Sequence, residues 1–232
     1  MSVASFKRYM AGAALLAGLL WMALTAAGEA PVVIPAPALD NPRQSGRLQT
    51  AVLAGGCFWG MQGVFEHVRG VHEVLAGYSG GARGSAEYQQ VGTGRTGHAE
   101  SVQIVFDPAE LTYGELLHIY FSVAHDPTEL NRQGPDSGTQ YRSAIFYADE
   151  TQRRIAESYI AQLNKERAFA QPIVTRVDEL KGFYPAESYH QDFYLKNPQY
   201  PYIVVIDLPK IRSLKQLFPD DYQDRPVTVG AR

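Results

Sequence analysis

The single cysteine of this 232-residue chain is the residue best suited to chemistry. Cys57 follows the pair Gly55 and Gly56 and precedes two large aromatic residues, Phe58 and Trp59. Because glycine tolerates backbone angles that other residues avoid, the pair predicts a sharp turn from a strand into a helix. A cysteine at a helix N-terminus lies near free N–H groups and the positive end of the helix dipole. We therefore expect a thiol of lowered pKa that acts as a nucleophile, with a buried, inert cysteine as the alternative.

The two aromatic residues after the cysteine point in different directions if they begin a helix. Phe58 and Trp59 then cannot both face one core. We expect one of them to pack in the core and the other to line a cavity beside the sulfur. An apolar wall at that place suits a small hydrophobic group of a substrate.

A carboxylate on the apolar side of a strand is the second candidate group. Glu100 shares its parity with Val102, Ile104 and Phe106, and side chains alternate between the two faces of a strand. Partial desolvation would raise the pKa of this carboxyl group, so that it can donate a proton. The alternative is a carboxylate that curls back to solvent or pairs with an arginine.

Two loops hold further polar candidates. The segment 131–143 (NRQGPDSGTQYRS) uses turn-forming residues to space Asp136 and Tyr141 before a strand. Tyr88 lies in the glycine-rich loop 79–97. Either loop can be purely structural, so the residue types alone leave their roles open.

Histidine is the usual partner of a nucleophilic cysteine. Among the six histidines, His98 and His190 are the best candidates for a base, although neither has a distinctive sequence context. One cysteine and scattered histidines do not form a metal-ligand cluster, so no metal is expected. The glycine-rich run 91–97 lacks the preceding strand and the lysine of a phosphate-binding loop.

Short β-like runs alternate with helical ones along the body of the chain. One helix has a clear start, because Asp149 is a typical cap with Gln152 three residues later. The order β-α-β-β-α-β-α-β predicts an α/β fold, namely a two-layer α/β sandwich with a mixed, ferredoxin-like sheet. The expected strands span 48–54, 74–78, 100–106, 141–147 and 173–177, and the other helices span 58–67 and 113–124.

The N-terminal segment differs from the body. Lys7 and Arg8 precede an uncharged apolar run at 10–27, so residues 1–28 are expected to be a signal peptide or, if not cleaved, a membrane anchor. We expect an exported, periplasmic protein. A linker at 29–47, a catalytic domain at 48–209 and a polar C-terminal tail at 210–232 would follow. The net charge of −3 argues against nucleic acid as a partner.

Taken together, five sequence blocks resemble one enzyme family. The match spans about residues 50 to 203, with the blocks in the family's order, and the family is that of the A-type peptide methionine sulfoxide reductases. The blocks are GGCFWG at 55–60, GYSGG at 77–81, TGHAE at 96–100, HDPTELNRQGPDSGTQYRS at 125–143 and FYPAESYHQDF at 183–193.

The resemblance implies reduction of the S epimer of methionine sulfoxide, free and in oxidised proteins, with no metal or organic cofactor. Cys57 would attack the sulfoxide sulfur and become a sulfenic acid, a reversible oxidation state of cysteine. Glu100 would protonate the sulfoxide oxygen. In the implied substrate-binding set, Tyr88 and Tyr141 hydrogen-bond that oxygen, Phe58 and Trp59 hold the methyl group, and Asp136 orients the substrate.

The chain departs from the family pattern in two places. Many members carry further cysteines that resolve the sulfenic acid as a disulfide, whereas Cys57 has no such partner in this chain. The loop 82–87 also lacks the Asn-Pro that often precedes the equivalent of Tyr88. We therefore expect an external thiol reductant, which is thioredoxin-like, glutaredoxin-like or a small thiol, and a monomeric enzyme.

Two other functions remain open from the residues. A thiol peroxidase also uses one reactive cysteine and passes through a sulfenic acid, but it requires a cationic group near the sulfur. A catalytically silent binding module for methionine-rich segments would retain its binding when Cys57 is replaced by serine.

Overall fold

The structure is a computed structural model that describes residues 31–230. The expected export segment, residues 1–28, therefore lies outside the described residues, which begin at Pro31. Within the described residues, no helix combines the length and the apolar character needed to cross a membrane.

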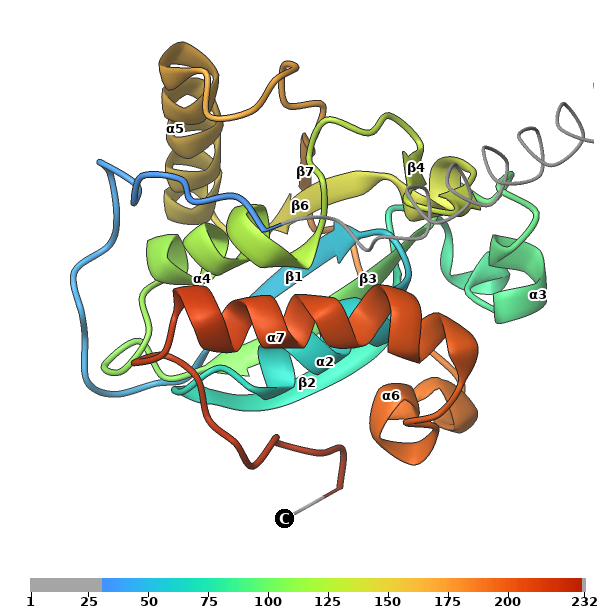
Figure 1. The fold of residues 1–232 in the computed structure, drawn as a ribbon. Helices are drawn as coiled ribbons and strands as arrows, with labels where there is room; N and C mark the ends of the chain where they lie inside the picture. The colour runs from blue at the N-terminus through green and yellow to red at the C-terminus, as the bar shows by residue number, and fades with distance from the viewer. Residues whose placement is uncertain (1–30, 231–232) are drawn as a thin grey trace, which may run out of the picture.

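A mixed sheet of six strands forms the centre of the molecule, in the order β7-β6-β1-β3-β2-β8 (Figure 1). Neighbouring strands are antiparallel except for β6 and β7, which are parallel. A separate hairpin pairs two short strands in the loop before β6. The strands are β1 (Gln49–Gly55), β2 (Val71–Ser79), β3 (Ala99–Phe106), β4 (Arg132–Gln133), β5 (Asp136–Ser137), β6 (Ser143–Tyr147), β7 (Arg176–Glu179) and β8 (Phe183–Pro185).

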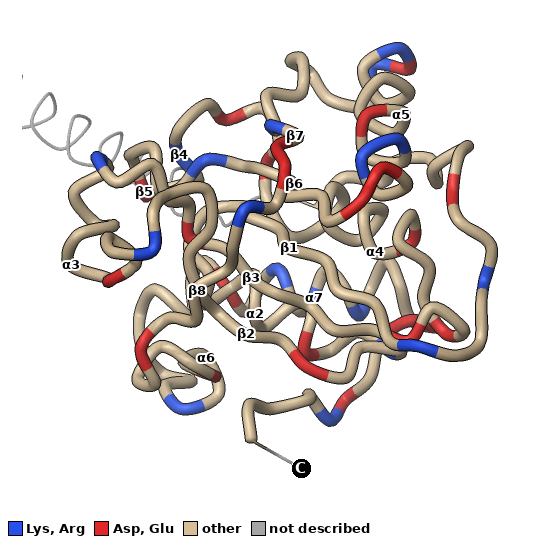
Figure 2. Tube along the Cα trace, turned by 180° about the vertical axis from the view of Figure 1, so that it is seen from behind, with Lys and Arg blue, Asp and Glu red and all other residues tan. Residues whose placement is uncertain are grey.

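The long helices cover one face of this sheet. In Figure 1 α2, α4 and α7 lie in front of the strands, and in Figure 2, seen from behind, the strands face the viewer. Two π-helical turns, Tyr120–Ala124 and Ile203–Asp207, extend this layer. The helices are α2 (Phe58–Glu66), α3 (Tyr88–Val91), α4 (Tyr113–Ile119), α5 (Glu150–Glu166), α6 (Phe193–Lys196) and α7 (Leu208–Leu217).

The main core lies between the sheet and the helices, and α2 is at its centre. Every residue of α2 except Trp59 is buried, which is typical of a helix enclosed by other elements rather than one with a wet face. On the opposite face of the sheet, a small cluster includes Val52, Ala144 and Phe146. The rigid, buried helix therefore fixes the position of the residue at its N-terminus, Cys57.

The predicted α/β class with a mixed sheet is confirmed, and several boundaries differ. The strand expected at 173–177 begins only at Arg176, because the preceding segment bonds to a loop instead, with the Val174 N–H donating to the Pro127 carbonyl. Tyr141 belongs to a 3-10 turn before β6 rather than to the strand. The strand β8 and the short helices α3 and α6 were not expected, since such short elements carry little periodicity.

The body of the protein also extends beyond 48–209. Helix α7 continues past residue 209, and its Ile211 and Leu214 are buried against the core. In the expected linker, Ile34 is 5% exposed and belongs to the same core. Both flanking segments therefore contribute apolar side chains to the core, which composition alone did not reveal.

Candidate active site

The turn before Cys57 takes the shape that its two glycines permit. Gly56 has φ of +89°, and a Cβ at this position would lie 2.6 Å from the side chain of Gln133. Only glycine fits a left-handed conformation under so close a neighbour. The chain then enters α2 with Cys57 at the N-cap, so its thiol lies at the N-terminal end of the buried helix.

Glu100 meets this helix end from β3. Its Oε2 accepts a hydrogen bond of 3.1 Å from the backbone N–H of Phe58, and the side chain is 3% exposed. Burial, together with the nearby carboxylates of Asp136 and Asp207, raises the pKa of Glu100 to about 8, although the Phe58 N–H partly opposes this shift. Glu100 is therefore largely protonated at neutral pH.

The expected lowering of the Cys57 pKa is wrong. Burial, followed by the carboxyl groups of Glu100 and Asp207, raises the pKa of the thiol well above its ordinary value. The backbone N–H of Trp59 favours the thiolate, as a helix N-terminus should. Loss of water and nearby negative charge outweigh that contribution, so the resting sulfur is a thiol.

All seven residues expected in the site come together around one cavity of about 120 Å³. They come from five different parts of the chain, which meet at one end of α2. Two tyrosines that the sequence did not indicate complete the lining. The full set is Cys57, Phe58, Trp59, Tyr88, Glu100, Asp136, Tyr141, Tyr200 and Tyr202.

Hydrogen bonds of the Tyr88 backbone, and of the residue that follows Tyr141, hold these two loop tyrosines in place. The carboxylate of Glu187 accepts from the Tyr88 N–H at 2.9 Å and, through its other oxygen, from the Tyr78 hydroxyl at 2.8 Å. Arg142, next to Tyr141, donates to the carbonyls of residues 97, 98 and 139 at 2.7–3.1 Å. Burial raises the pKa of both Tyr88 and Tyr141, so their phenols remain hydrogen-bond donors at neutral pH.

Asp136 reaches the cavity from strand β5 of the hairpin. The hydroxyl of Tyr202 donates a hydrogen bond to its Oδ2. Burial raises the pKa of Asp136, whereas this hydrogen bond lowers it. The contact joins the hairpin to the C-terminal part of the chain, which closes one side of the cavity.

Phe58 and Trp59 have different surroundings, as expected for adjacent residues of a helix. Phe58 is 1% exposed and belongs to the core, whereas Trp59 is only partly buried. The indole of Trp59 stacks on Phe193, with centroids 3.8 Å apart and the planes tilted by 10°, and it meets Tyr202 edge-on. This aromatic cluster forms the apolar wall of the cavity.

The two candidate histidines occupy different places. His190 Nδ1 lies 3.1 Å from the Trp59 indole nitrogen, Nε1, beside the cavity. His98 is instead bonded within the glycine-rich loop, with Nδ1 accepting from the Gly81 N–H at 3.2 Å and Nε2 lying 3.0 Å from the Ala82 carbonyl oxygen. Neither histidine lines the cavity, so neither is placed as a base for Cys57.

Asp207 is the charged residue that sequence reasoning missed most clearly. It is fully buried, and a Cβ at Gly60 would lie 2.3 Å from its Oδ1, so it packs on the first turn of α2. Its only sequence signal is a charge inside the apolar run 203–208. Tyr200 and Tyr202 flank Pro201 and carry no pattern that predicts a cavity.

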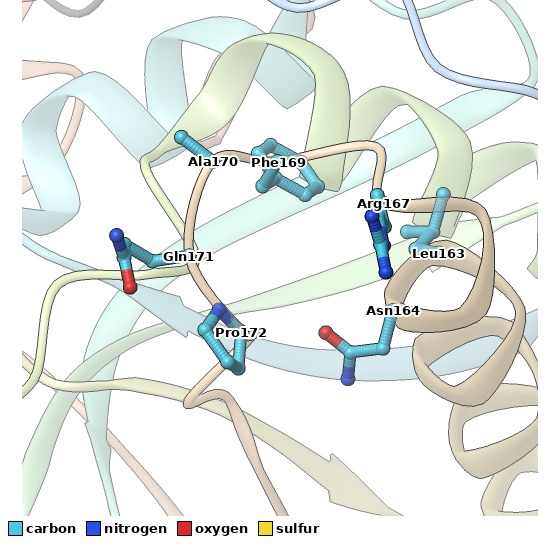
Figure 3. A pocket seen from close by; sticks show the side chains of 7 residues that line it. All are labelled: Leu163, Asn164, Arg167, Phe169, Ala170, Gln171 and Pro172. Carbon is cyan, nitrogen blue, oxygen red and sulfur yellow. The ribbon is translucent and has the colours of Figure 1, made fainter.

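Larger hollows lie elsewhere on the described surface. One of about 310 Å³ lies at the C-terminal end of α5, where Asn164, Arg167 and residues 169–172 line it (Figure 3). It contains neither a thiol nor a carboxyl group. Among residues 31–230, no three His, Cys, Asp or Glu side chains are grouped to hold a metal ion. The cavity at Cys57 is therefore the candidate active site.

Comparison with known proteins indicates the same family that the five sequence blocks resemble. The family described as "Peptide methionine sulfoxide reductase" matches residues 49–222. The chain is 62% identical over 181 residues to peptide methionine sulfoxide reductase MsrA 2 of Mesorhizobium japonicum, covering 78% of this chain and 93% of that one. It is 54% identical over 191 residues to MsrA 2 of Synechocystis, covering 81% and 89%.

Solved structures agree in fold. Methionine sulfoxide reductase A of Corynebacterium diphtheriae superimposes with a TM-score of 0.57 and 35% identity, covering 75% of this chain and 88% of that one. Reduced Mxr1 of Saccharomyces cerevisiae gives a TM-score of 0.59 and 32% identity, covering 68% and 91%. With a family match over most of its length and relatives above half identity, the chain belongs to the peptide methionine sulfoxide reductase family of oxidoreductases.

Proposed function

We propose that Cys57 carries out the reduction of methionine S-sulfoxide to methionine, in peptides and as the free amino acid, by attacking the sulfoxide sulfur. One observation carries this assignment. The N-cap thiol shares a cavity of about 120 Å³ with a carboxyl group that is largely protonated at neutral pH. That carboxyl, from Glu100, is bonded to the N–H of the residue next to the nucleophile.

The cavity supports selection of one epimer. A sulfoxide sulfur carries a methyl group, an oxygen, a methylene chain and a lone pair at four corners. The wall of Phe58 and Trp59 receives the methyl group, and Glu100 with the tyrosine hydroxyls receives the oxygen. With Cys57 facing the sulfur and the chain leaving through the opening, only one handedness satisfies all contacts at once.

Donors around the oxygen lower the barrier to attack. As Cys57 bonds to the sulfur, negative charge develops on the sulfoxide oxygen, and a sulfoxide is a poor electrophile without a proton source. Glu100 donates its proton there, while the phenols of Tyr88 and Tyr141 hydrogen-bond the same atom. Because the resting Cys57 is a thiol, its proton passes to Glu100, and the charge of the site remains constant.

The first half-reaction leaves an oxidised enzyme. The sulfur–oxygen bond of the substrate breaks, methionine is reduced by two electrons, and Cys57 becomes a sulfenic acid. A thiol from outside the chain then attacks the Cys57 sulfur, water leaves, and a mixed disulfide forms. A second thiol releases Cys57 and forms a disulfide of the reductant. External thiols are needed because this chain contains no second cysteine.

A thiol peroxidase is less consistent with this site. Such an enzyme uses a cationic group to stabilise its thiolate, whereas none of the described residues that line the cavity is Lys or Arg. The charged groups that act on the Cys57 pKa are the carboxyl groups of Glu100, Asp207 and Asp136, which raise it. This electrostatic environment favours a site that handles protons on a neutral substrate.

An assay with separated substrate epimers tests the proposal. The R and S sulfoxides of one methionine peptide are incubated with the enzyme and dithiothreitol, and hydrogen peroxide is tested in parallel. We expect consumption of the S form alone. Equal turnover of both epimers, or faster turnover of peroxide, would reject the assigned geometry.

A further inference from the structure

The hydrogen bond between Trp59 and His190 fixes the protonation state of a buried histidine. Trp59 Nε1 lies 3.1 Å from His190 Nδ1. An indole N–H is only a donor, so Nδ1 must be the acceptor. The imidazole is therefore neutral and carries its proton on Nε2, in agreement with the burial that lowers the pKa of His190.

The imidazole ring is enclosed by the aromatic residues of the site. His190 is 2% exposed, and its centroid lies 5.0 Å from that of Phe58 and 4.4 Å from that of Tyr88. It thus contacts two residues that line the cavity, while it bonds to a third, Trp59. His190 itself does not line the cavity, so its influence on a substrate passes through these neighbours.

Packing alone does not explain an imidazole at this position. Its Nε2 is buried and has no hydrogen-bond partner within residues 31–230. A buried donor without a partner costs stability, and an apolar ring of similar shape would avoid that cost. The feature that an apolar ring could not supply is the acceptor at Nδ1, which is used by Trp59.

The stack of Trp59 on Phe193 does not by itself fix the orientation of the indole. Parallel rings 3.8 Å apart fix the plane of the indole, but a half-turn about its Cβ–Cγ bond keeps the ring in that plane and exchanges its two edges. A hydrogen bond to Nε1 is directional. It therefore selects the edge of the indole that faces the cavity.

We propose that His190 is a positioning residue, whose Nδ1 holds the Trp59 indole in the orientation that forms the methyl-binding wall. This inference rests on the proposed function for its effect on turnover. The effect on the indole itself is independent of that function and can be measured separately.

Fluorescence can report on Trp59 directly. The chain has two tryptophans, Trp21 and Trp59, so the variant Trp21→Phe of the full chain leaves one emitter. In this background, His190→Phe retains a ring but removes the acceptor, and His190→Asn retains an acceptor close to the place of Nδ1. Circular dichroism checks folding, and His190→Leu replaces His190→Phe if that variant does not fold.

We expect His190→Phe to change the emission maximum of Trp59 and to raise KM for the S-sulfoxide peptide roughly tenfold, as the loss of one positioning hydrogen bond would. The value of kcat should change less than about threefold, since the reacting groups remain in place. His190→Asn should restore most of both effects. Unchanged Trp59 emission and unchanged KM in His190→Phe would overturn the proposal.

A double-mutant cycle separates positioning from general packing. If His190 acts through Trp59, adding His190→Phe to Trp59→Phe should raise KM no further. Fully additive effects would contradict the proposal. Should the Trp21→Phe parent fail to reduce any sulfoxide, the proposed function fails, while the emission of Trp59 still tests whether His190 positions the indole.

Discussion

Each end of helix α2 lies against a buried carboxyl group, yet within residues 31–230 only the carboxyl group at the N-terminal end lines the candidate active site. At the N-terminus, Glu100 lines a cavity together with Cys57. At the C-terminus, Glu66 is fully buried, and burial together with the charge of Asp192 raises its pKa to about 10. A raised carboxyl pKa is thus shared by both ends.

The C-terminal segment closes the second end. The N–H of Val227 donates to the backbone oxygen of Glu66 at 3.0 Å, and that of Gln223 donates to the carbonyl of His67 at 2.8 Å. The ring of Tyr222 stacks on His67 with centroids 5.4 Å apart. The comparison teaches that a protonated buried carboxyl marks a catalytic site only where it opens on a cavity beside a nucleophile.

Loss of the nucleophile should have the largest effect on this comparison. We expect Cys57→Ser to lower turnover of the S-sulfoxide by at least about 10⁴-fold, because the chain has no other thiol. Thermal unfolding should change little, since Ser differs from Cys by one atom. Peptide binding measured by calorimetry should persist. Turnover within tenfold of the parent would show that the N-terminal end of α2 is not the reactive one.

Substitution of each carboxyl group in turn tests whether the two ends of α2 differ in function. Glu100→Ala should reduce kcat by roughly 10³-fold through loss of the general acid, and Glu100→Gln should lose less because an amide still donates a hydrogen bond. Glu66→Gln is the matched control and should retain kcat within about threefold. Steady-state kinetics of the three variants check this. Equal rates for Glu100→Ala and the parent would remove the acid role.

The pH dependence of the free energy of unfolding should also distinguish the two ends of α2, although this effect is smaller. Both folded-state pKa values lie above the ordinary value of 4.5, at about 8 for Glu100 and about 10 for Glu66. Each contribution is therefore fully present below pH 4.5 and is lost as the pH rises through the folded-state pKa. Of these two carboxyl groups, only Glu66 still contributes a loss between pH 8 and 10, with a slope of up to about 1.4 kcal/mol per pH unit for one proton.

Urea unfolding at several pH values measures this slope. Glu66→Gln should flatten the decline in the free energy of unfolding between pH 8 and 10 relative to the parent. Glu100→Gln should flatten it only below about pH 8. An unchanged slope in Glu66→Gln would mean that the carboxyl at the C-terminal end of α2 is ionised in the folded protein.

Local signals in the sequence predicted much of the candidate site. The two glycines indicated the turn, and Gly56 has the positive φ that only glycine adopts readily. The parity of β3 predicted that Glu100 shares the buried face with Val102 and Ile104. The Asp149 cap is also found, because its side chain accepts from the Gln152 N–H at 2.9 Å. Each of these depends on neighbours within a few positions.

The contacts that join these groups escaped sequence reasoning because their partners lie far apart in the sequence. Tyr202 bonds to Asp136, and His190 bonds to Trp59 more than a hundred positions away. The sign of the Cys57 pKa shift was wrong for the same reason. The helix end that favours a thiolate is local, whereas the burial and the Asp207 carboxyl that oppose it come from the folded chain.

The sequence by itself therefore determined the family, the strand-turn-helix around Cys57 and the inward side of Glu100, because backbone preference and side-chain alternation act between near neighbours. Tertiary structure alone decided that the resting sulfur is a thiol, that two further tyrosines complete the lining of the cavity and that the C-terminal segment covers the other end of α2. These properties depend on the exclusion of water and on the summed field of distant charges, and no segment carries either before the chain has folded.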